Sequence, residues 1–153
     1  MIEESQGAVR VREVEEKFNS SLFHGLRILI VDDDVDTREF LHFLLQQNGA
    51  LITAAASVKE ALTIIAQVVP NLLISDLGMP EIDGYSLIKI LRAMPKEEGG
   101  EIPAIALTAY AGESDRDRVL AAGFQKHIAK PVQPTELLTS IADLLEQRVG
   151  SGE

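Results

Sequence analysis

Aspartate residues collect at the ends of two apolar runs, and they are the residues of this sequence that most suggest chemistry. Residues 28–37 read ILIVDDDVDT, in which four apolar residues lead directly into Asp32, Asp33 and Asp34. A second run, NLLISDLGMP, closes on Asp76. At an effective dielectric constant near 20, two carboxylates about 4 Å apart repel by about 4 kcal/mol. Carboxylates gathered in this way therefore need a cation between them or full exposure to water.

Two further polar residues end apolar runs. Thr108 closes the run in IPAIALTAY, and Lys130 closes the run in KHIAKP. Several carboxylates in one crevice suit a hard divalent cation such as Mg²⁺, which prefers oxygen ligands. A lysine beside them adds a second positive charge, and a phosphoryl group fits between the metal and the ammonium. Asp34 and Asp36 are assigned instead to the start of a helix, where the helix dipole favours negative charge.

The elements that must position these residues alternate along the chain. The apolar runs predict strands at Arg27–Val31, Leu51–Ala55, Leu72–Ser75, Ile102–Leu107 and His127–Ala129. Helical patterns fall between and after them, at residues 36–49, 57–68, 84–94, 112–123 and 134–149. Ser57 and Glu60 have capping-box spacing, and Pro134 suits a first helical turn. Strict alternation of strand and helix predicts an α/β fold with a parallel sheet covered on both faces.

This arrangement predicts where the polar residues meet. In an open parallel sheet, ligands bind beyond the carboxyl ends of the strands. The pair Asp32 and Asp33 stands at one such end, and Asp76, Thr108 and Lys130 stand at three others. We therefore expect four of the five strands to deliver polar side chains to the same edge of the sheet.

Composition limits the class of protein. The chain has 153 residues, is 46% hydrophobic and carries a net charge of -10, with no cysteine. Binding to the phosphate backbone of a nucleic acid needs a basic surface, so the negative net charge argues against it and no nucleic-acid binding is expected. No apolar stretch approaches a membrane span, and the acidic N-terminus is unlike a signal peptide. A cytoplasmic protein without membrane contact is predicted, with residues 1–24 as a linker or extension, 25–149 as one folded domain and 150–153 as a disordered tail. A short dimerising helix within residues 11–22 is the alternative for the N-terminal extension.

From about Leu26 to Val149 the sequence resembles the receiver domain of two-component response regulators. The segments that carry the resemblance are ILIVDDD, LLISDLGMPEIDGYSLI, IPAIALTAYA and AAGFQKHIAKPV, which occur in the order and at the intervals of that family. The resemblance implies a flavodoxin-like (βα)5 sandwich with a central five-stranded parallel sheet of strand order 2-1-3-4-5. It covers essentially all of the predicted domain.

The resemblance also implies roles for the acidic residues. Asp76 would be the phosphoacceptor, a carboxylate nucleophile that forms an aspartyl phosphate. Asp33 would bind Mg²⁺ (or Mn²⁺) directly, together with Asp76, and Asp32 would orient the metal or bind it through water. The backbone carbonyl of Gly78 would be the third protein ligand. Glycine at this position would also leave the acceptor open to water.

Further roles follow from the same resemblance. Lys130 and Thr108 would each contact a phosphoryl oxygen, and the Lys130–Pro131 peptide bond is expected to be cis. Thr108 would also move toward the phosphoryl group, and the side chain of His127 would then rotate inward as a switch. The family usually has Tyr or Phe at that position, so histidine leaves the switch chemistry open. Tyr110 would cover the site and oppose the openness at Gly78.

The implied function is that of a phosphoacceptor rather than a classical enzyme, although the domain would speed its own phosphorylation and dephosphorylation. The donor would be a histidine kinase or a histidine phosphotransfer protein. A downstream protein would bind the face formed by the helix at 112–123, the strand at 127–129 and the helix at 134–149. Receivers attached to hybrid sensor kinases offer the better match, and a stand-alone single-domain regulator is the alternative.

Two rival readings fit the residues less well. Haloacid dehalogenase-like phosphatases also use an aspartate nucleophile, Mg²⁺ and a lysine, but Thr37 comes one residue too early after Asp34-Val35-Asp36 for their motif. An EF-hand calcium loop would need glycine at Thr37 and a bidentate glutamate at Phe43. The calcium-binding interpretation is rejected, and a haloacid dehalogenase-like phosphatase is kept only as an alternative.

Overall fold

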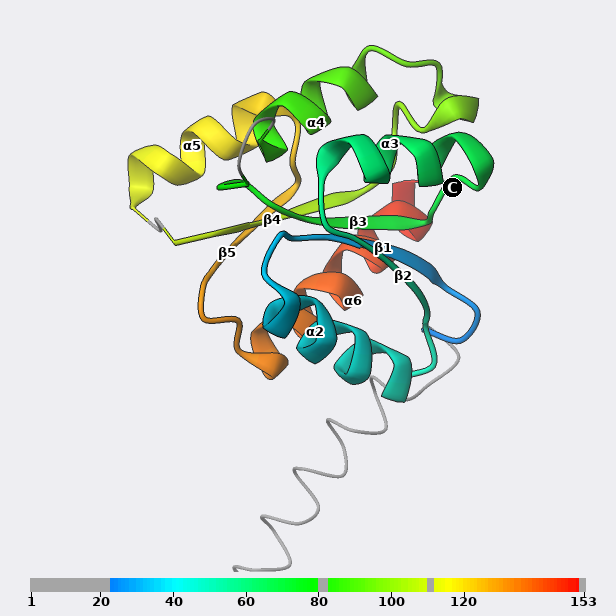
Figure 1. The fold of residues 1–153 in the computed structure, drawn as a ribbon, viewed down its shortest axis with the longest axis vertical. Helices are drawn as coiled ribbons and strands as arrows, with labels where there is room; N and C mark the ends of the chain where they lie inside the picture. The colour runs from blue at the N-terminus through cyan, green and yellow to red at the C-terminus, as the bar shows by residue number, and fades with distance from the viewer. Residues whose placement is uncertain (1–22, 80–82, 110–111, 152–153) are drawn as a thin grey trace, which may run out of the picture.

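Five parallel strands form the centre of the computed structural model, which describes residues 23–79, 83–109 and 112–151 (Figure 1). The strands are β1 Arg27–Val31, β2 Leu51–Ala55, β3 Leu72–Asp76, β4 Ala104–Thr108 and β5 Lys126–Ala129. Their order in the sheet is β2-β1-β3-β4-β5, and every neighbouring pair is parallel. The α/β fold and the strand order predicted from the sequence are confirmed. The helix considered within residues 11–22 lies outside the described residues.

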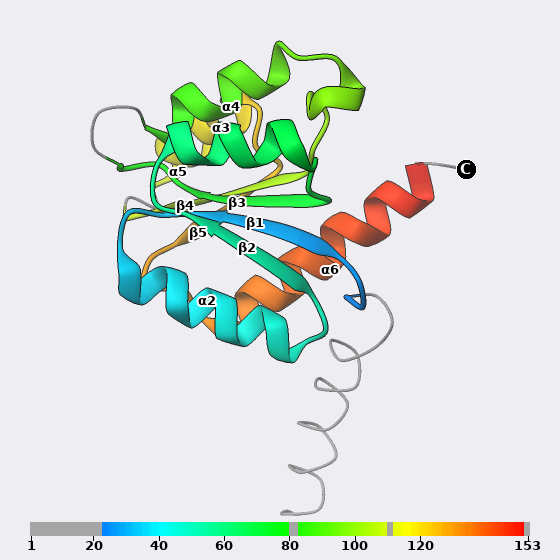
Figure 2. The ribbon, with the colours of Figure 1, turned by 45° about the vertical axis from the view of Figure 1, so that its right-hand side comes forward.

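Helices cover both faces of the sheet (Figure 2). They are α2 Val35–Gln47, α3 Val58–Gln67, α4 Gly84–Arg92, α5 Glu113–Ala122 and α6 Pro134–Ser151, with a short 3₁₀ helix at Lys96–Glu98. Helices α2 and α6 lie on one face, and α3, α4 and α5 lie on the other. Among the described residues, no helix combines the length and the apolar character needed to cross a bilayer.

Alternation along the strands divides the core into two apolar clusters. On β1, Ile28 and Ile30 pack into the cluster beneath α2 and α6. Leu29 and Val31 point the opposite way, into the cluster beneath α3, α4 and α5. All four side chains are at most 1% exposed. A strand that is buried on both faces reads as an unbroken apolar run, which explains why ILIV lacks the polar alternation of a half-exposed strand.

Side-chain caps fix where the helices begin. Asp34 accepts hydrogen bonds from the backbone N–H of Thr37, at 3.3 Å, and from its hydroxyl, at 2.6 Å, which confirms its assignment to the start of a helix. Ser57 Oγ accepts from Glu60 N at 3.1 Å. The return contact differs from a standard capping box, because Glu60 Oε2 accepts from the N–H of Ala56, at 3.4 Å, rather than from that of Ser57. Each of these helices therefore starts directly after a strand.

The fourth strand begins later than predicted. The expected strand at Ile102–Leu107 is found at Ala104–Thr108, although Ile102 is buried. Pro103 has no N–H to donate to a sheet ladder, so it precedes the strand rather than belonging to it. Its carbonyl oxygen still accepts a hydrogen bond from Leu73 N at 2.9 Å. The shift places Thr108, the residue of chemical interest, as the last residue of β4.

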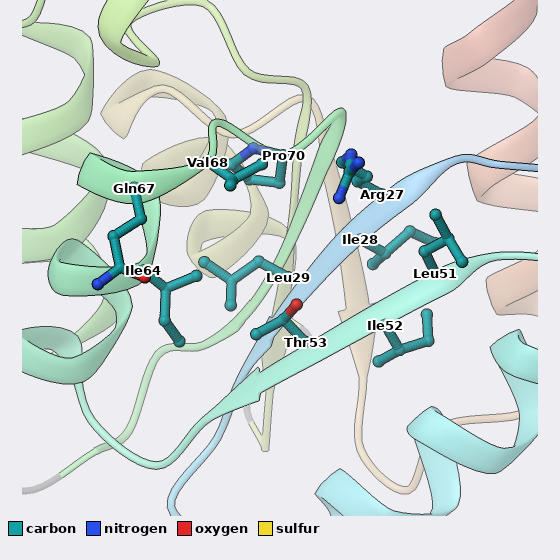
Figure 3. Close-up of a pocket in the computed structure, with 10 residues that line it drawn as sticks. All are labelled: Arg27, Ile28, Leu29, Leu51, Ile52, Thr53, Ile64, Gln67, Val68 and Pro70. Atoms are coloured by element: carbon teal, nitrogen blue, oxygen red, sulfur yellow. The ribbon is translucent and has the colours of Figure 1, made fainter.

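Strand β2 forms an open edge of the sheet, beside a groove of about 220 Å³ (Figure 3). Leu29 and Thr53 lie in the groove, Ile64 of α3 faces them, and Arg27 is the one charged residue among those that line it. Arg27 is the first residue of β1, and Pro70 comes shortly before β3. The groove therefore lies at the amino ends of the strands. It is therefore remote from the aspartates and lacks their chemistry.

Arg92 links the ends of α4 and α5. Its Nε and Nη2 donate to the carbonyl oxygen of Gly123 at 3.0 and 2.8 Å, and Nη1 donates to that of Gly100 at 3.0 Å. Gly123 follows α5 with a φ of 125°, a left-handed conformation that suits glycine. Partial burial lowers the pKa of Arg92. The arginine of α4 therefore satisfies the carbonyl oxygen that follows α5 and connects the two helices on their shared face of the sheet.

Replacing Arg92 by methionine tests this link. The variant keeps the apolar stem but leaves the carbonyls of Gly123 and Gly100 without their donors, so we expect the free energy of unfolding to fall by about 1–3 kcal/mol. Lys89→Met is the matched control, because Lys89 is an exposed cation of the same helix, and its effect should stay within about 0.5 kcal/mol. Urea denaturation measures both. Equal losses in the two variants would show that Arg92 acts only as a surface charge.

Candidate functional site

The carboxyl ends of the strands bring the predicted site residues together. Asp32 follows β1 directly, Asp76 ends β3, Thr108 ends β4 and Lys130 follows β5. Carboxylate oxygens of Asp32, Asp33 and Asp76 all lie within 4.8 Å of one another. The sheet thus gathers three carboxylates and one ammonium at a single edge.

Asp32 is the most deeply buried member of the group, with no exposed surface. Its Oδ1 accepts a hydrogen bond from the backbone N–H of Asp34 at 2.9 Å. Its Oδ2 lies 2.9 Å from Nζ of Lys130, within ion-pair distance. Within the described residues, this ion pair is the one contact recorded for Oδ2. A lone pair of Asp32 is therefore still available to a further partner.

Asp76 lies at the buried end of a crevice, with 6% of its surface exposed. Its Oδ1 accepts from the backbone N–H of Gly78 at 3.1 Å and lies 3.3 Å from Nζ of Lys130. Lys130 therefore contacts Asp32 and Asp76 together. The lysine side chain is 25% exposed, so it is less deeply buried than either carboxylate that it contacts.

The charges perturb one another. Burial raises the pKa of Asp32, and the nearby ammonium of Lys130 only partly offsets this effect, while the Asp76 carboxylate adds to it. Burial alone would lower the pKa of Lys130, but the carboxylates of Asp32 and Asp76 outweigh it and the pKa is raised. The lysine is therefore firmly protonated, and the carboxylates are held close together at an electrostatic cost. Such a cluster favours an additional cation.

Tight backbone packing holds β3, the strand that ends at Asp76, in place. A Cβ atom at residue 84 would overlap the carbonyl oxygen of Asp76, so only glycine fits the start of α4 there. Asp83, just before it, caps the helix by accepting from Ser86 N at 3.0 Å. The importance of Gly84 was not predicted; the Asp-Gly pair in the sequence signals a turn but not this contact. On the other side, the backbone N–H of Lys130 donates to the carbonyl oxygen of Thr108 at 2.8 Å.

The acidic cluster fits a divalent metal. Asp33 is exposed, whereas Asp32 and Asp76 are buried, so the cluster opens to solvent on one side. Three carboxylates within reach of one another, one of them with an unsatisfied buried oxygen, form the oxygen-rich environment that Mg²⁺ prefers. The Lys130–Pro131 peptide bond is cis, as expected, and it precedes α6.

The crevice above the cluster has a volume of about 540 Å³. Asp76, Gly78, Thr108 and Lys130 line it, in agreement with the expected grouping of these residues. Its other walls include Tyr85 of α4 and Asp83, the residue before α4. They also include Asp115 and Arg118 of α5. No motif marks Tyr85 or Arg118 in the sequence, and both were missed.

His127 lies apart from this crevice. It pairs with Ala106 in the sheet, two residues before the Thr108–Ala129 pair at the strand ends, and it is half-buried. Its neighbour Ile128 packs beneath α2 and α6, so His127 faces the side of α4 and α5. The predicted role of Tyr110 lies outside the described residues.

A substitution at Asp32 tests the electrostatic strain of the cluster. A carboxyl group whose pKa is higher in the folded state lowers stability above its unfolded pKa, and the cost disappears below that pKa, where both states are protonated. In EDTA at neutral pH, Asp32→Asn should therefore raise the free energy of unfolding by about 1 kcal/mol. The asparagine side-chain oxygen can still accept the hydrogen bond from Asp34 N, and Lys130 still has its ion pair with Asp76. The gain should shrink as the pH falls from neutral toward the usual aspartate range, and it should vanish below that range. Urea titrations across pH measure it, and a variant less stable than the parent at neutral pH would contradict it.

Comparison with known sequences agrees with this geometry. The sequence profile of the response regulator receiver domain matches residues 28–142. An uncharacterized 14.6 kDa protein of Leptolyngbya boryana is 51% identical over 111 residues, which are 72% of this chain and 83% of that protein. Hybrid signal transduction histidine kinase D of Dictyostelium discoideum is 35% identical over 143 residues, which are 90% of this chain but 9% of the kinase. The chain spans about half the length, 46–55%, of several transcriptional and response regulators that it also matches.

Solved structures show the same fold. A CheY-like response regulator receiver domain protein from Methanospirillum hungatei superposes with a TM-score of 0.74 at 29% identity, over 83% of this chain and 98% of that one. The signal receiver domain of a signal transduction histidine kinase from Syntrophus aciditrophicus has a TM-score of 0.72 at 32% identity, over 80% and 92% of the two chains. With its strand order, its clustered aspartates and a profile match across most of its length, the chain belongs to the response regulator receiver domain family.

Proposed function

We propose that this chain is the phosphoacceptor of a two-component signalling system and that Asp76 accepts a phosphoryl group from a phosphohistidine. The observation that carries the proposal is the placement of Asp76 at the bottom of the crevice. There its carboxylate lies 3.3 Å from the Lys130 ammonium and beside the carboxylates of Asp32 and Asp33. A nucleophile, a cation and a metal-binding cluster at one point are what phosphoryl transfer requires.

The residues of the chain act mainly by positioning and charge. A carboxylate oxygen of Asp76 attacks phosphorus, the P–N bond to the donor imidazole breaks, and the imidazole leaves with its electron pair. Lys130 and the hydroxyl of Thr108, which line the same crevice, contact phosphoryl oxygens. Mg²⁺ (or Mn²⁺), held by Asp33 and Asp76 with Asp32 and the carbonyl of Gly78, would supply further positive charge to the transferring group. Holding these groups in place removes much of the entropic barrier.

Phosphorylation would change the contacts of Lys130. Its ammonium now lies 2.9 Å from Asp32 and 3.3 Å from Asp76, and a phosphoryl group with more charge than a carboxylate would draw it away from Asp32. Thr108 would follow, and its backbone is hydrogen-bonded to Lys130 at the end of β5. We propose that this movement reaches His127 and shifts the face formed by α5, β5 and α6 toward a partner-binding state.

The donor would be a histidine kinase or a histidine phosphotransfer protein in the cytoplasm, and the folded unit would span residues 25–149. Two contexts remain for that unit. Similarity to the hybrid kinase of Dictyostelium supports a receiver within a longer sensor kinase. The 14.6 kDa relative, most of whose length is covered, favours a stand-alone regulator. Both contexts use the same acceptor chemistry.

Phosphoryl transfer is tested by incubating the full chain with Mg²⁺ and acetyl phosphate. Intact mass should show a single phosphoryl adduct, and peptide mapping should place it on the peptide that contains Asp76. Asp76→Asn should remain unlabelled, because an amide is not a nucleophile for this reaction, and EDTA should prevent labelling of the parent chain. An adduct that persists in Asp76→Asn or in EDTA would contradict the proposal.

Metal binding is tested by thermal unfolding in Mg²⁺ and in EDTA. A ligand that binds only the folded state stabilises it by about 2.7 kcal/mol at a hundred times its dissociation constant, so saturating Mg²⁺ should raise the melting temperature. Asp33→Asn should lose most of this rise. Asp36→Asn is the matched control, because Asp36 is an exposed acid in the first turn of α2 outside the cluster, and it should keep the rise. Equal responses of the two variants would place the metal elsewhere.

A further inference from the structure

A guanidinium group lies at the mouth of the phosphoacceptor crevice. The Arg118 guanidinium carbon is 4.5 Å from the centre of the Tyr85 ring, a cation–π contact that joins α5 to α4. Both residues line the crevice that contains Asp76 and Lys130. Arg118 is exposed, whereas Asp76 is 6% exposed. The crevice therefore has a cation at its solvent end as well as one at its buried end.

No carboxylate among the described residues neutralises Arg118. Within residues 23–79, 83–109 and 112–151, no acidic group makes an ion pair with it. Asp83 and Asp115 line the same crevice, but Asp83 caps α4 through Ser86 N and Asp115 lies in the first turn of α5. In the part of the chain that the structure describes, the Tyr85 ring rather than an ion pair holds the guanidinium. Its N–H donors therefore remain able to bind an incoming anion.

We propose that Arg118 receives the leaving group when the phosphoryl donor is an acyl phosphate. In-line transfer requires the leaving oxygen to point away from the attacking oxygen. With Asp76 at the buried end, the leaving group points toward the solvent end, where Arg118 lies. A planar guanidinium matches the two oxygens of a departing carboxylate in a bidentate contact. This role rests on the proposed function and adds a donor preference to it.

The chemistry distinguishes two classes of donor. With acetyl phosphate, a carboxylate oxygen of Asp76 bonds to phosphorus and the P–O bond to the acetyl group breaks. Acetate leaves with the electron pair and a full negative charge, and no proton is needed. With phosphoramidate, the P–N bond breaks and ammonia leaves neutral, because its nitrogen is already protonated in the donor. A cation at the leaving-group position stabilises the first departure and not the second.

Tyr85 would be a positioning residue in this scheme. Its ring fixes the guanidinium over the crevice without touching the donor. Tyr85→Phe keeps an aromatic face and should preserve the donor preference, whereas Tyr85→Leu removes the face and releases Arg118 to solvent. If the donor preference is lost in Tyr85→Leu and kept in Tyr85→Phe, the aromatic ring positions Arg118 and the tyrosine hydroxyl is not needed.

The experiment compares the two donors on the full chain in Mg²⁺. Intact mass over time gives kcat/KM for labelling of Asp76 by acetyl phosphate and by phosphoramidate, and the ratio of the two is the readout. Arg118→Gln and Tyr85→Leu should lower the ratio about tenfold, less than the ~10²–10³ of a buried oxyanion donor because Arg118 is exposed. Arg116→Gln, which removes an exposed charge of α5 outside the crevice, is the control and should keep the parent ratio.

The outcomes separate this inference from the proposed function. If Asp76 is labelled by both donors but the ratio is unchanged in Arg118→Gln, the role of Arg118 is refuted and the phosphoacceptor function stands. If Arg116→Gln lowers the ratio as much, the effect is one of net charge and the specific contact is also refuted. If neither donor labels Asp76 in the parent chain, both proposals fail together. A selective fall in Arg118→Gln and Tyr85→Leu supports the inference.

Discussion

The burial of the Asp32 carboxylate beside the Asp76 carboxylate is the constraint on which the rest of the site depends. Burial raises the pKa of Asp32, and one ammonium, that of Lys130, faces both carboxylates. The cluster is therefore held under electrostatic strain that a bound cation would relieve. The clustered carboxylates lower the folding stability of the chain, and the same cluster can bind a cation. Functional sites often combine these two properties.

The fold imposes this strain through its sheet. Strands β1, β3 and β4 are buried on both faces, so their carboxyl ends are fixed by the two apolar clusters rather than by local loops. Gly84 lets α4 pack against the backbone of Asp76, and the hydrogen bond between Lys130 and Thr108 ties the last strand to its neighbour. A change in the charge of Asp76 would therefore be felt by α4, β4 and β5 together. This shared framework would be the physical basis for linking the proposed acceptor to the proposed partner surface.

Much of this could be predicted from the sequence, because unbroken apolar runs that end in polar residues report buried parallel strands and their carboxyl ends. The meeting of Asp32, Asp76 and Lys130 at one edge of the sheet follows from that pattern alone. The predicted start of β4 was wrong, because an apolar run does not register that Pro103 lacks the N–H a strand needs. The stacking of Arg118 on Tyr85 could not be predicted, since it depends on how α4 and α5 are rotated against each other. Such contacts leave no periodic signal in the chain.

The most direct test of the central claim is binding of beryllium fluoride, a tetrahedral mimic of a phosphoryl group, followed by ¹⁹F NMR. A bound fluoride resonance should appear that requires Mg²⁺ and the carboxylate of Asp76, and it should be lost in EDTA and in Asp76→Asn. Binding should be weaker in Lys130→Gln, because the ammonium that faces both carboxylates is gone. A bound resonance that survives in EDTA or in Asp76→Asn would show that the crevice does not assemble the phosphoryl site described above.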